Sequence, residues 1–270
     1  MTILEEIFAH KRVELELFKQ VKPMAQAQAE AAQAPPPLDF TAALLEARGA
    51  FPALIAEVKR ASPSRGVLVS DFDPVRLARI YRENGAAAIS VLTDERYFQG
   101  SLDHLNRIAA SFAPLPERPP LLRKDFIFDE YQLYEARAAG ADAVLLIVAG
   151  LEQGRLRALH ALALELGMAS LVEVHSLEEL NTALNCDPLL VGINNRDLHN
   201  FSVSLETTLK LRPFIPAGIC VVAESGIHTP QDVACLHQAG VDAILVGEAL
   251  VTAADIPGQV RRLSGHDSSS

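Results

Sequence analysis

The sequence has few cysteines and none in a paired motif. Its 270 residues include Cys186, Cys220 and Cys235, with no C-x-x-C spacing. Three cysteines are too few for a disulfide framework, so we expect a reducing intracellular compartment. We interpret all three as small core residues.

Basic residues are outnumbered by acidic ones. The chain has 24 lysines and arginines against 34 aspartates and glutamates, which gives a formal net charge of −10. Proteins that bind DNA or RNA normally carry a basic surface that neutralises phosphates, so nucleic acid is excluded as a partner. Any site for an anion must therefore be local.

Long apolar runs and glycine-rich nucleotide loops are also missing. No uncharged run approaches the roughly 20 residues that a membrane span requires, and the start, MTILEEIFAHKR, lacks the apolar stretch of a signal peptide. We expect a cytoplasmic protein without a membrane partner.

No G-x-G-x-x-G or G-x-x-x-x-G-K-[ST] motif occurs, which argues against a doubly wound open sheet.

What the sequence has instead is a regular alternation of short aliphatic runs and helical segments. This alternation favours a parallel sheet, and eight such units favour a closed (β/α)8 TIM barrel. Gly85, Gly140 and Gly240 precede three of the runs and suit left-handed helix caps. The expected strands are residues 54–58, 87–92, 120–123, 143–148, 170–174, 189–194, 219–224 and 243–247.

An N-terminal helical extension precedes the barrel. Apolar residues at helical spacing predict an amphipathic helix over residues 2–20. Residues 22–37 are rich in Ala, Gln and Pro, and we interpret them as a connector. We expect an extension with its linker over residues 1–50, the barrel over 51–263 and a disordered tail over 264–270, in a chain that is a monomer.

Polar residues at the strand ends are candidates for chemistry, because barrel enzymes build their active sites there. Glu57 and Lys59 lie two residues apart, so they share one face of their strand. Both line the barrel mouth if Ile55 faces inward; a surface ion pair is the plainer alternative.

The third strand ends in a second charged group. In LLRKDF, either Lys124 and Phe126 or Arg123 and Asp125 face the barrel mouth. A carboxylate at the end of a hydrophobic strand is costly to desolvate unless it is paired or functional. Further polar residues that end strands are Glu173, Asn194, Arg196 and Glu224.

The last two strands end in segments suited to a phosphate. Gly226 and Gly247 would let backbone N–H groups approach an anion, and the turn from Ser62 to Ser64 could complete the grip. The histidines, cysteines and carboxylates lack metal-ligand spacing, so we expect no metal. His175 and His228 lie just beyond strands and stay as weaker candidates.

Taken together, IAEVKRASPSRG, LRKDFI, LVEVH, INNRDL, AESGI and LVGEAL resemble the indole-3-glycerol-phosphate synthase family over essentially the whole barrel. The resemblance implies a carboxy-lyase of tryptophan biosynthesis that needs no cofactor. Its substrate would be a phosphosugar, 1-(2-carboxyphenylamino)-1-deoxyribulose 5-phosphate, which is cyclised with loss of carbon dioxide and water.

The resemblance also implies roles for individual residues. Lys124 would be the general acid and Glu173 would assist proton transfer in dehydration, while Lys59, paired with Glu57, would hold the substrate carboxylate or act as the acid itself. Substrate contacts would come from Asn194, Arg196, Glu224, Phe126, Leu145 and Leu198. Phosphate contacts would come from Ser62, Ser225, Gly226, Gly247 and Glu248, although the family pattern has a small hydroxyl residue at position 248.

Three other functions fit parts of this pattern. A Schiff-base aldolase would use Lys59 or Lys124 as a nucleophile, but this requires a largely neutral lysine and three neighbouring carboxylates oppose it. The second alternative is the sister isomerase of the same pathway. The two lysines and the third glutamate of this sequence fit the synthase motifs better than those of the isomerase. A non-catalytic phosphate-binding barrel is the remaining alternative.

Overall fold

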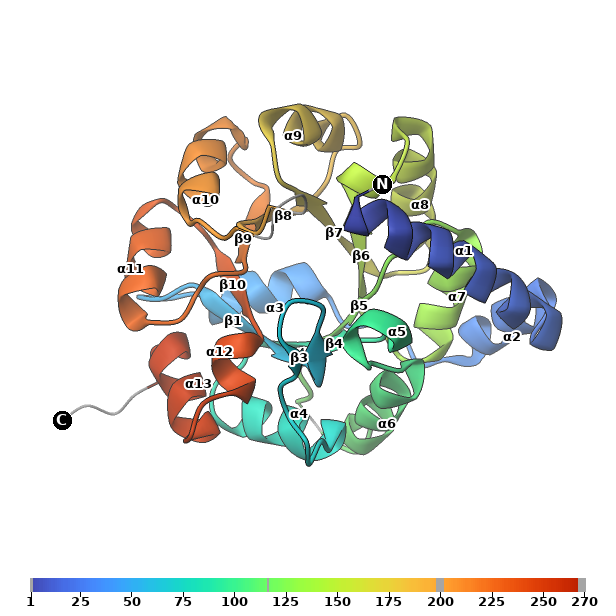
Figure 1. The fold of residues 1–270 in the computed structure, drawn as a ribbon, viewed down its shortest axis with the longest axis horizontal. Helices are drawn as coiled ribbons and strands as arrows, with labels where there is room; N and C mark the ends of the chain where they lie inside the picture. The colour runs from blue at the N-terminus through green and yellow to red at the C-terminus, as the bar shows by residue number, and fades with distance from the viewer. Residues whose placement is uncertain (1, 116, 198–201, 267–270) are drawn as a thin grey trace.

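A closed barrel of eight parallel strands forms the centre of the molecule (Figure 1). The computed structural model describes residues 2–115, 117–197 and 202–266. Neighbouring strands pair in parallel in the order β1-β10-β9-β8-β7-β6-β5-β4, and β4 closes on β1. The strands are β1 (Ala53–Val58), β4 (Ala88–Leu92), β5 (Leu121–Lys124), β6 (Ala143–Ile147), β7 (Ala169–Val174), β8 (Leu190–Asn194), β9 (Cys220–Glu224) and β10 (Ala243–Val246).

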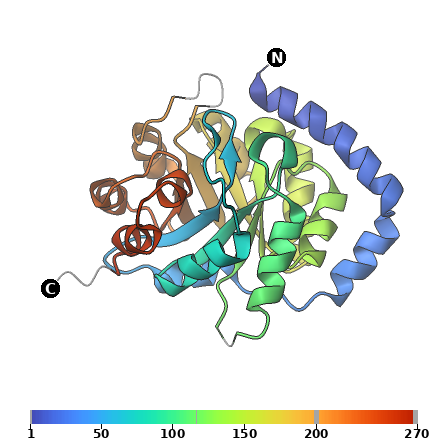
Figure 2. The same ribbon diagram turned by 60° about the horizontal axis from the view of Figure 1, so that its bottom comes forward.

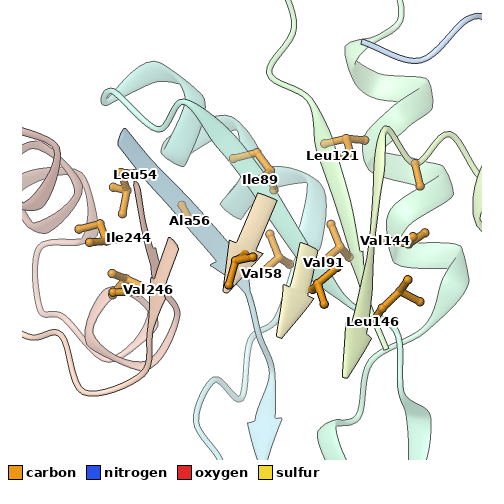
Figure 3. Packing of buried hydrophobic residues seen from close by; sticks show 14 of the residues in the cluster. Leu54, Ala56, Val58, Ile89, Val91, Leu121, Val144, Leu146, Ile244 and Val246 are labelled. Carbon is orange, nitrogen blue, oxygen red and sulfur yellow. The ribbon is translucent and has the colours of Figure 1, made fainter. Parts of the chain in front are cut away.

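Each strand is buried on both faces, which is why the strands read as continuous apolar runs. Outward residues such as Leu54, Ile89 and Val91 pack beneath the surrounding helices (Figure 3). Inward residues such as Ile55 and Leu122 fill the barrel interior. The expected (β/α)8 TIM barrel is confirmed.

Helices surround the barrel and begin at residues that cap them. In α4, Asp73 accepts hydrogen bonds from two backbone N–H groups and Pro74 follows it, which is a favoured start for a helix. The larger barrel helices are α4 (Pro74–Glu83), α6 (Leu102–Phe112), α7 (Glu130–Ala138), α8 (Gln153–Glu165), α9 (Leu177–Leu184), α10 (Glu206–Leu211), α11 (Pro230–Gln238) and α13 (Ile256–Ser264). The shorter ones are α5 (Glu95–Phe98), α12 (Glu248–Val251) and the 3-10 turns η1 (Val148–Gly150) and η2 (Arg212–Phe214).

Three glycines end helices as expected. Gly85, Gly140 and Gly240 have φ angles of 101°, 89° and 82°. This left-handed conformation carries no Cβ penalty in glycine. These glycines let each helix stop and turn directly into the next strand.

The N-terminal extension consists of α1 (Ile3–Val21), α2 (Met24–Gln33) and α3 (Phe40–Ala47). A capping box between Thr2 and Glu5 starts α1. Figure 2 shows α1 and α2 following one flank of the barrel. Phe40 and Leu44 of α3 belong to the apolar cluster inside the barrel.

Some expectations for this region and for the cysteines were wrong. The expected connector over residues 22–37 contains the helix α2, whose Ala27 packs with Leu15 and Tyr131. Its alanines are small enough for close helix contact, which the composition alone does not reveal. Cys235 is exposed, whereas Cys186 and Cys220 are buried.

The C-terminal end differs in part from the expected tail over residues 264–270. Ser264 is the last residue of α13 and Gly265 caps it. Residues 267–270 lie outside the described residues. Of the helices that the structure describes, none has the length and apolar character needed to cross a bilayer.

Candidate active site

A cavity of about 400 Å³ opens at the carboxyl ends of the barrel strands. The residues selected from the sequence converge on it, although they come from strands far apart in the chain. Leu198 lies outside the described residues. The others, Glu57, Lys59, Ser62, Lys124, Phe126, Leu145, Glu173, Asn194, Arg196, Glu224, Ser225, Gly226, Gly247 and Glu248, all line the cavity.

Lys124 lies at the centre of the charged groups. Its Nζ atom is 3.4 Å from Oε2 of Glu224 and 3.7 Å from Oε2 of Glu173. Burial by itself lowers the pKa of Lys124, but the negative charges of Glu224, Glu173 and Glu57 outweigh it and raise this pKa above its ordinary value. The lysine is therefore held as a cation that can donate a proton.

Glu57 and Lys59 form a second ion pair at the end of β1. Ile55 faces the barrel interior, so the alternation of side chains brings Glu57 and Lys59 to the cavity. The Lys59 Nζ atom is 3.4 Å from Oε1 of Glu57 and 5.6 Å from the ring centre of Phe98. A cation over an aromatic face is attracted by the ring, so two groups orient Lys59.

Asp125 and Arg123 belong to a separate buried network beside the site. Arg123 Nη2 is 3.1 Å from Oδ2 of Asp125. The Nζ atom of Lys11, from α1, is 3.1 Å from Oδ1 of Asp125. Thr93 donates a 2.6 Å hydrogen bond to the same carboxylate. This network holds the backbone next to Lys124; Lys124 and Phe126 line the cavity, and Asp125 also borders it, whereas Arg123 does not.

Glu224 is almost completely buried at the end of β9. Burial raises its pKa, the charge of Lys124 lowers it and the charge of Glu173 raises it, so that the pKa lies above its ordinary value. Among the described residues, Glu224 Oε1 and Glu173 Oε2 have no hydrogen-bond partner. Buried polar atoms are normally satisfied, so these two oxygens are available to accept hydrogen bonds from a polar ligand.

The loop after β9 has an unusual backbone. Ser225 and Gly226 have φ angles of 66° and 77°. A left-handed serine is uncommon, and such backbone conformations concentrate at ligand sites. Ser62, in the short strand β2 (Ala61–Ser62) that pairs with β3 (Gly66–Val67), lines the same cavity. This side of the cavity is suited to an anion.

Glu248, the departure noted in the sequence, is paired. It begins α12, and its carboxylate forms an ion pair with Arg65, which lies between β2 and β3. The guanidinium compensates the carboxylate beside the candidate phosphate site. The acid at position 248 is therefore not an isolated negative charge.

Sequence reasoning missed several lining residues. Ile3, Leu4 and Ile7 of α1 and Phe98 of α5 contribute apolar surface to the cavity. Their apolar character was visible in the sequence, but no pattern indicated which surface they cover. His228 also lines the cavity. Across the described part of the chain, no group of three or more His, Cys, Asp or Glu side chains is arranged to hold a metal ion.

Solved structures similar to this chain are barrel proteins with low sequence identity. 3-Hexulose-6-phosphate synthase from Salmonella typhimurium has a TM-score of 0.63 and 14% identity, with 79% of this chain and 97% of that chain covered. Thiamine phosphate pyrophosphorylase from Pyrococcus furiosus has a TM-score of 0.60 and 20% identity, with 80% and 95% covered. These likenesses establish the fold alone.

Sequence relatives are much more similar. The indole-3-glycerol phosphate synthase of Roseiflexus castenholzii is 56% identical over 268 residues, which cover 98% of each chain. That of Dehalococcoides mccartyi strain CBDB1 is 50% identical over 262 residues, 97% of this chain and 99% of the relative. The family model described as indole-3-glycerol phosphate synthase matches residues 4–263. This chain therefore belongs to the indole-3-glycerol phosphate synthase family, the decarboxylating lyases of tryptophan biosynthesis.

Proposed function

We propose that this chain closes the indole ring of 1-(2-carboxyphenylamino)-1-deoxyribulose 5-phosphate with Lys124 as the principal general acid. The observation that carries this proposal is the buried Lys124 ammonium between the carboxylates of Glu173 and Glu224. In ring closure, the aromatic carbon that bears the carboxylate attacks the sugar carbonyl carbon, and Lys124 gives a proton to the carbonyl oxygen.

Two further steps complete the reaction. Loss of carbon dioxide restores the aromatic ring, and the hydroxyl group then leaves as water with loss of a proton from the sugar-derived carbon. Glu173, beside Lys124, assists this proton transfer. Because a carboxylate leaves as neutral carbon dioxide, each turnover consumes one net proton.

The charge of Lys124 separates this reaction from Schiff-base chemistry. An amine nucleophile must be neutral, whereas the carboxylates of Glu224, Glu173 and Glu57 raise the pKa of Lys124. A cationic lysine is a proton donor. The aldolase alternative therefore has no support from the electrostatics of this site.

The two ends of the cavity would hold the two ends of the substrate. Ser62, Ser225, Gly226, Gly247 and the backbone of Glu248 would bind the phosphate. Phe126 and Leu145 would receive the aromatic ring. Fixing a flexible substrate so that its reacting carbons meet can lower the activation free energy of ring closure by on the order of several kcal/mol.

The remaining polar residues would orient the middle of the substrate. Asn194 and Glu224 would position its hydroxyl groups and anilino nitrogen, and Arg196 would anchor charges at the rim. Lys59, held by Glu57 and the ring of Phe98, would bind the substrate carboxylate until decarboxylation.

Single-turnover kinetics of two lysine variants tests these assignments. Lys124→Ala should retain its fold and lose at least about 100-fold in the rate of the chemical step, the usual contribution of a general acid. Lys59→Ala should mainly weaken substrate binding. A near-normal rate in Lys124→Ala with loss of the chemical step in Lys59→Ala would exchange the two roles.

We also propose that the protein is a cytoplasmic monomer. The three cysteines, which are free and show no C-x-x-C spacing, support a reducing compartment. Light scattering of the purified protein tests the monomer, and a mass of twice 29.2 kDa would refute it.

A further inference from the structure

His175 connects the candidate catalytic carboxylate of Glu173 to a second acidic side chain. It follows β7 directly, and its Nε2 atom is 3.4 Å from Oε1 of Glu173. Its Nδ1 atom is 3.0 Å from Oε2 of Glu179 on α9. The backbone N–H of His175 donates a 2.7 Å hydrogen bond to the same Glu179 oxygen. The hydrogen bond with Glu179 thus orients the imidazole ring, and Nε2, which has no hydrogen-bond partner among the described residues, faces Glu173 at ion-pair distance.

A second cavity borders His175, and Lys124 is not among its lining residues. It has a volume of about 630 Å³ and is lined in part by His175, Ser176 and Glu179. Asn194 and Arg196 line both this cavity and the candidate active site. The side chain of His175 is 12% exposed and that of Glu173 is 3% exposed. His175 therefore lies beside the buried carboxylate of Glu173 and also borders the second cavity.

The charges of the active site give this position chemical significance. Glu57, Glu173 and Glu224 place three carboxylates around the two ammonium groups of Lys59 and Lys124. A histidine that can carry a positive charge beside Glu173 compensates the excess of acid. Because both ring nitrogens of an imidazolium are donors, the charged form can donate to Glu173 and Glu179 at once.

We propose that His175, oriented by Glu179, is a positioning residue whose protonated ring fixes the carboxylate of Glu173 for proton transfer. This inference rests on the proton-transfer role proposed for Glu173. In the protonated state Nε2–H donates to Glu173 and Nδ1–H donates to Glu179. Loss of the ring proton leaves one donor for two carboxylates, and Glu173 loses its orientation or its counter-charge.

The surroundings favour the protonated ring. Burial by itself lowers the pKa of His175, but the hydrogen bond with Glu179 and the charges of Glu173, Glu179 and Glu224 outweigh it and raise this pKa. The other charged residues around the second cavity are Glu5 and Arg12 of α1 and Arg196 and Asp197 after β8. The positioning is therefore present below the raised pKa of His175 and is lost as the pH rises through it.

Two substitutions separate the charge of His175 from its shape. In His175→Gln, the side-chain amide can still donate to Glu173 but cannot titrate. In the wild type, kcat should fall at high pH as His175 loses its ring proton. This fall should be absent in His175→Gln. In Glu179→Gln, the imidazolium loses its partner, so the same fall should move to lower pH. His237→Gln, an exposed position on α11, should leave the profile unchanged.

NMR titration of the histidine ring protons gives a readout that does not depend on turnover. The signal that disappears in His175→Gln identifies His175, and we expect its pKa to lie above the ordinary value of about 6.5 and to fall in Glu179→Gln. His175→Ala should lower kcat by at least about tenfold, as is usual when the partner that orients a functional side chain is lost.

The outcomes distinguish this inference from the function on which it rests. If Glu173→Gln is inactive while His175→Gln and the wild type have superimposable pH profiles, the role of His175 is refuted and that of Glu173 stands. If Glu173→Gln keeps wild-type activity, the proposed role of Glu173 fails first. A His175 pKa at or below the ordinary value would also overturn the inference.

Discussion

At the scale of single residues, two glycines make room for the carboxylates of the site. A Cβ atom on Gly192 of β8 would collide with the carboxylate of Glu224 and lie 3.1 Å from Leu171. A Cβ atom on Gly247 would collide with the carboxylate of Glu57. Gly247 thus has a second reason to be glycine, beside the access to its backbone N–H expected from the sequence.

We expect Gly192→Ala to displace Glu224 from Lys124. The added methyl group should destabilise the fold by about 1–3 kcal/mol, as overpacking of a core does, and should lower kcat at least tenfold. Urea unfolding and steady-state kinetics measure the two effects. Gly154→Ala on α8, where a Cβ atom would meet nothing within 4 Å, is the matched control and should leave kcat unchanged without destabilising the fold. Wild-type kinetics in Gly192→Ala would contradict the account.

At the scale of elements, α1 is fastened to the barrel by a buried lysine. Lys11 Nζ lies 2.8 Å from Glu14, 3.1 Å from Asp125 and 3.4 Å from Asp94. Burial lowers the pKa of Lys11, but the charges of Asp125, Asp94 and Glu14 outweigh it and raise this pKa. The contact positions the segment of α1 that lines the active-site cavity.

Replacing Lys11 with methionine should free α1. Asp94 would lose its counter-charge and Asp125 would keep only Arg123; removal of one partner of a buried pair costs about 3–5 kcal/mol. We expect faster hydrogen exchange in α1 and a higher KM, since the apolar face of α1 would no longer cover the cavity. Lys19→Met removes a more exposed pair with Asp129 and should cost less than about 1 kcal/mol. Equal effects of the two substitutions would refute the special role of Lys11.

The hairpin of β2 and β3 is joined to α12 by the ion pair of Arg65 and Glu248. Arg65→Ala should leave the Glu248 carboxylate unpaired beside the bound phosphate and raise KM several-fold. Removal of both side chains in Arg65→Ala/Glu248→Ala should restore much of the affinity. If the double variant binds substrate no better than Arg65→Ala, charge compensation is not the function of this pair.

At the scale of the whole molecule, the sequence predicted the barrel because its strands are buried on both faces. Continuous apolar runs between glycine-capped helices therefore marked the strands. The predicted bounds of all eight strands lie within one residue of the observed bounds. The barrel topology then brought the polar residues at the strand ends to one cavity. The roles of individual residues in that cavity could be assigned only through the family resemblance. The spacing of residues along the sequence does not specify which lysine contacts which carboxylate.

Features that depend on contacts between distant segments could not be predicted in this way. The alanines of α2 carry too weak an apolar pattern to separate a helix from a connector. An amphipathic pattern identified α1 but not the cavity that Ile3, Leu4 and Ile7 cover. The pairs of Lys11 with Asp125 and Arg65 with Glu248 join residues more than 100 positions apart, and no local signal marks them.

The most direct test of the account is a fluorescence assay of the purified protein with 1-(2-carboxyphenylamino)-1-deoxyribulose 5-phosphate, with chelator present and no nucleotide added. We predict that the indole product appears with the wild type and at least about 100-fold more slowly with Lys124→Ala. No product from folded wild-type protein would contradict the proposed function, and product from Lys124→Ala at the wild-type rate would contradict the role of its central residue.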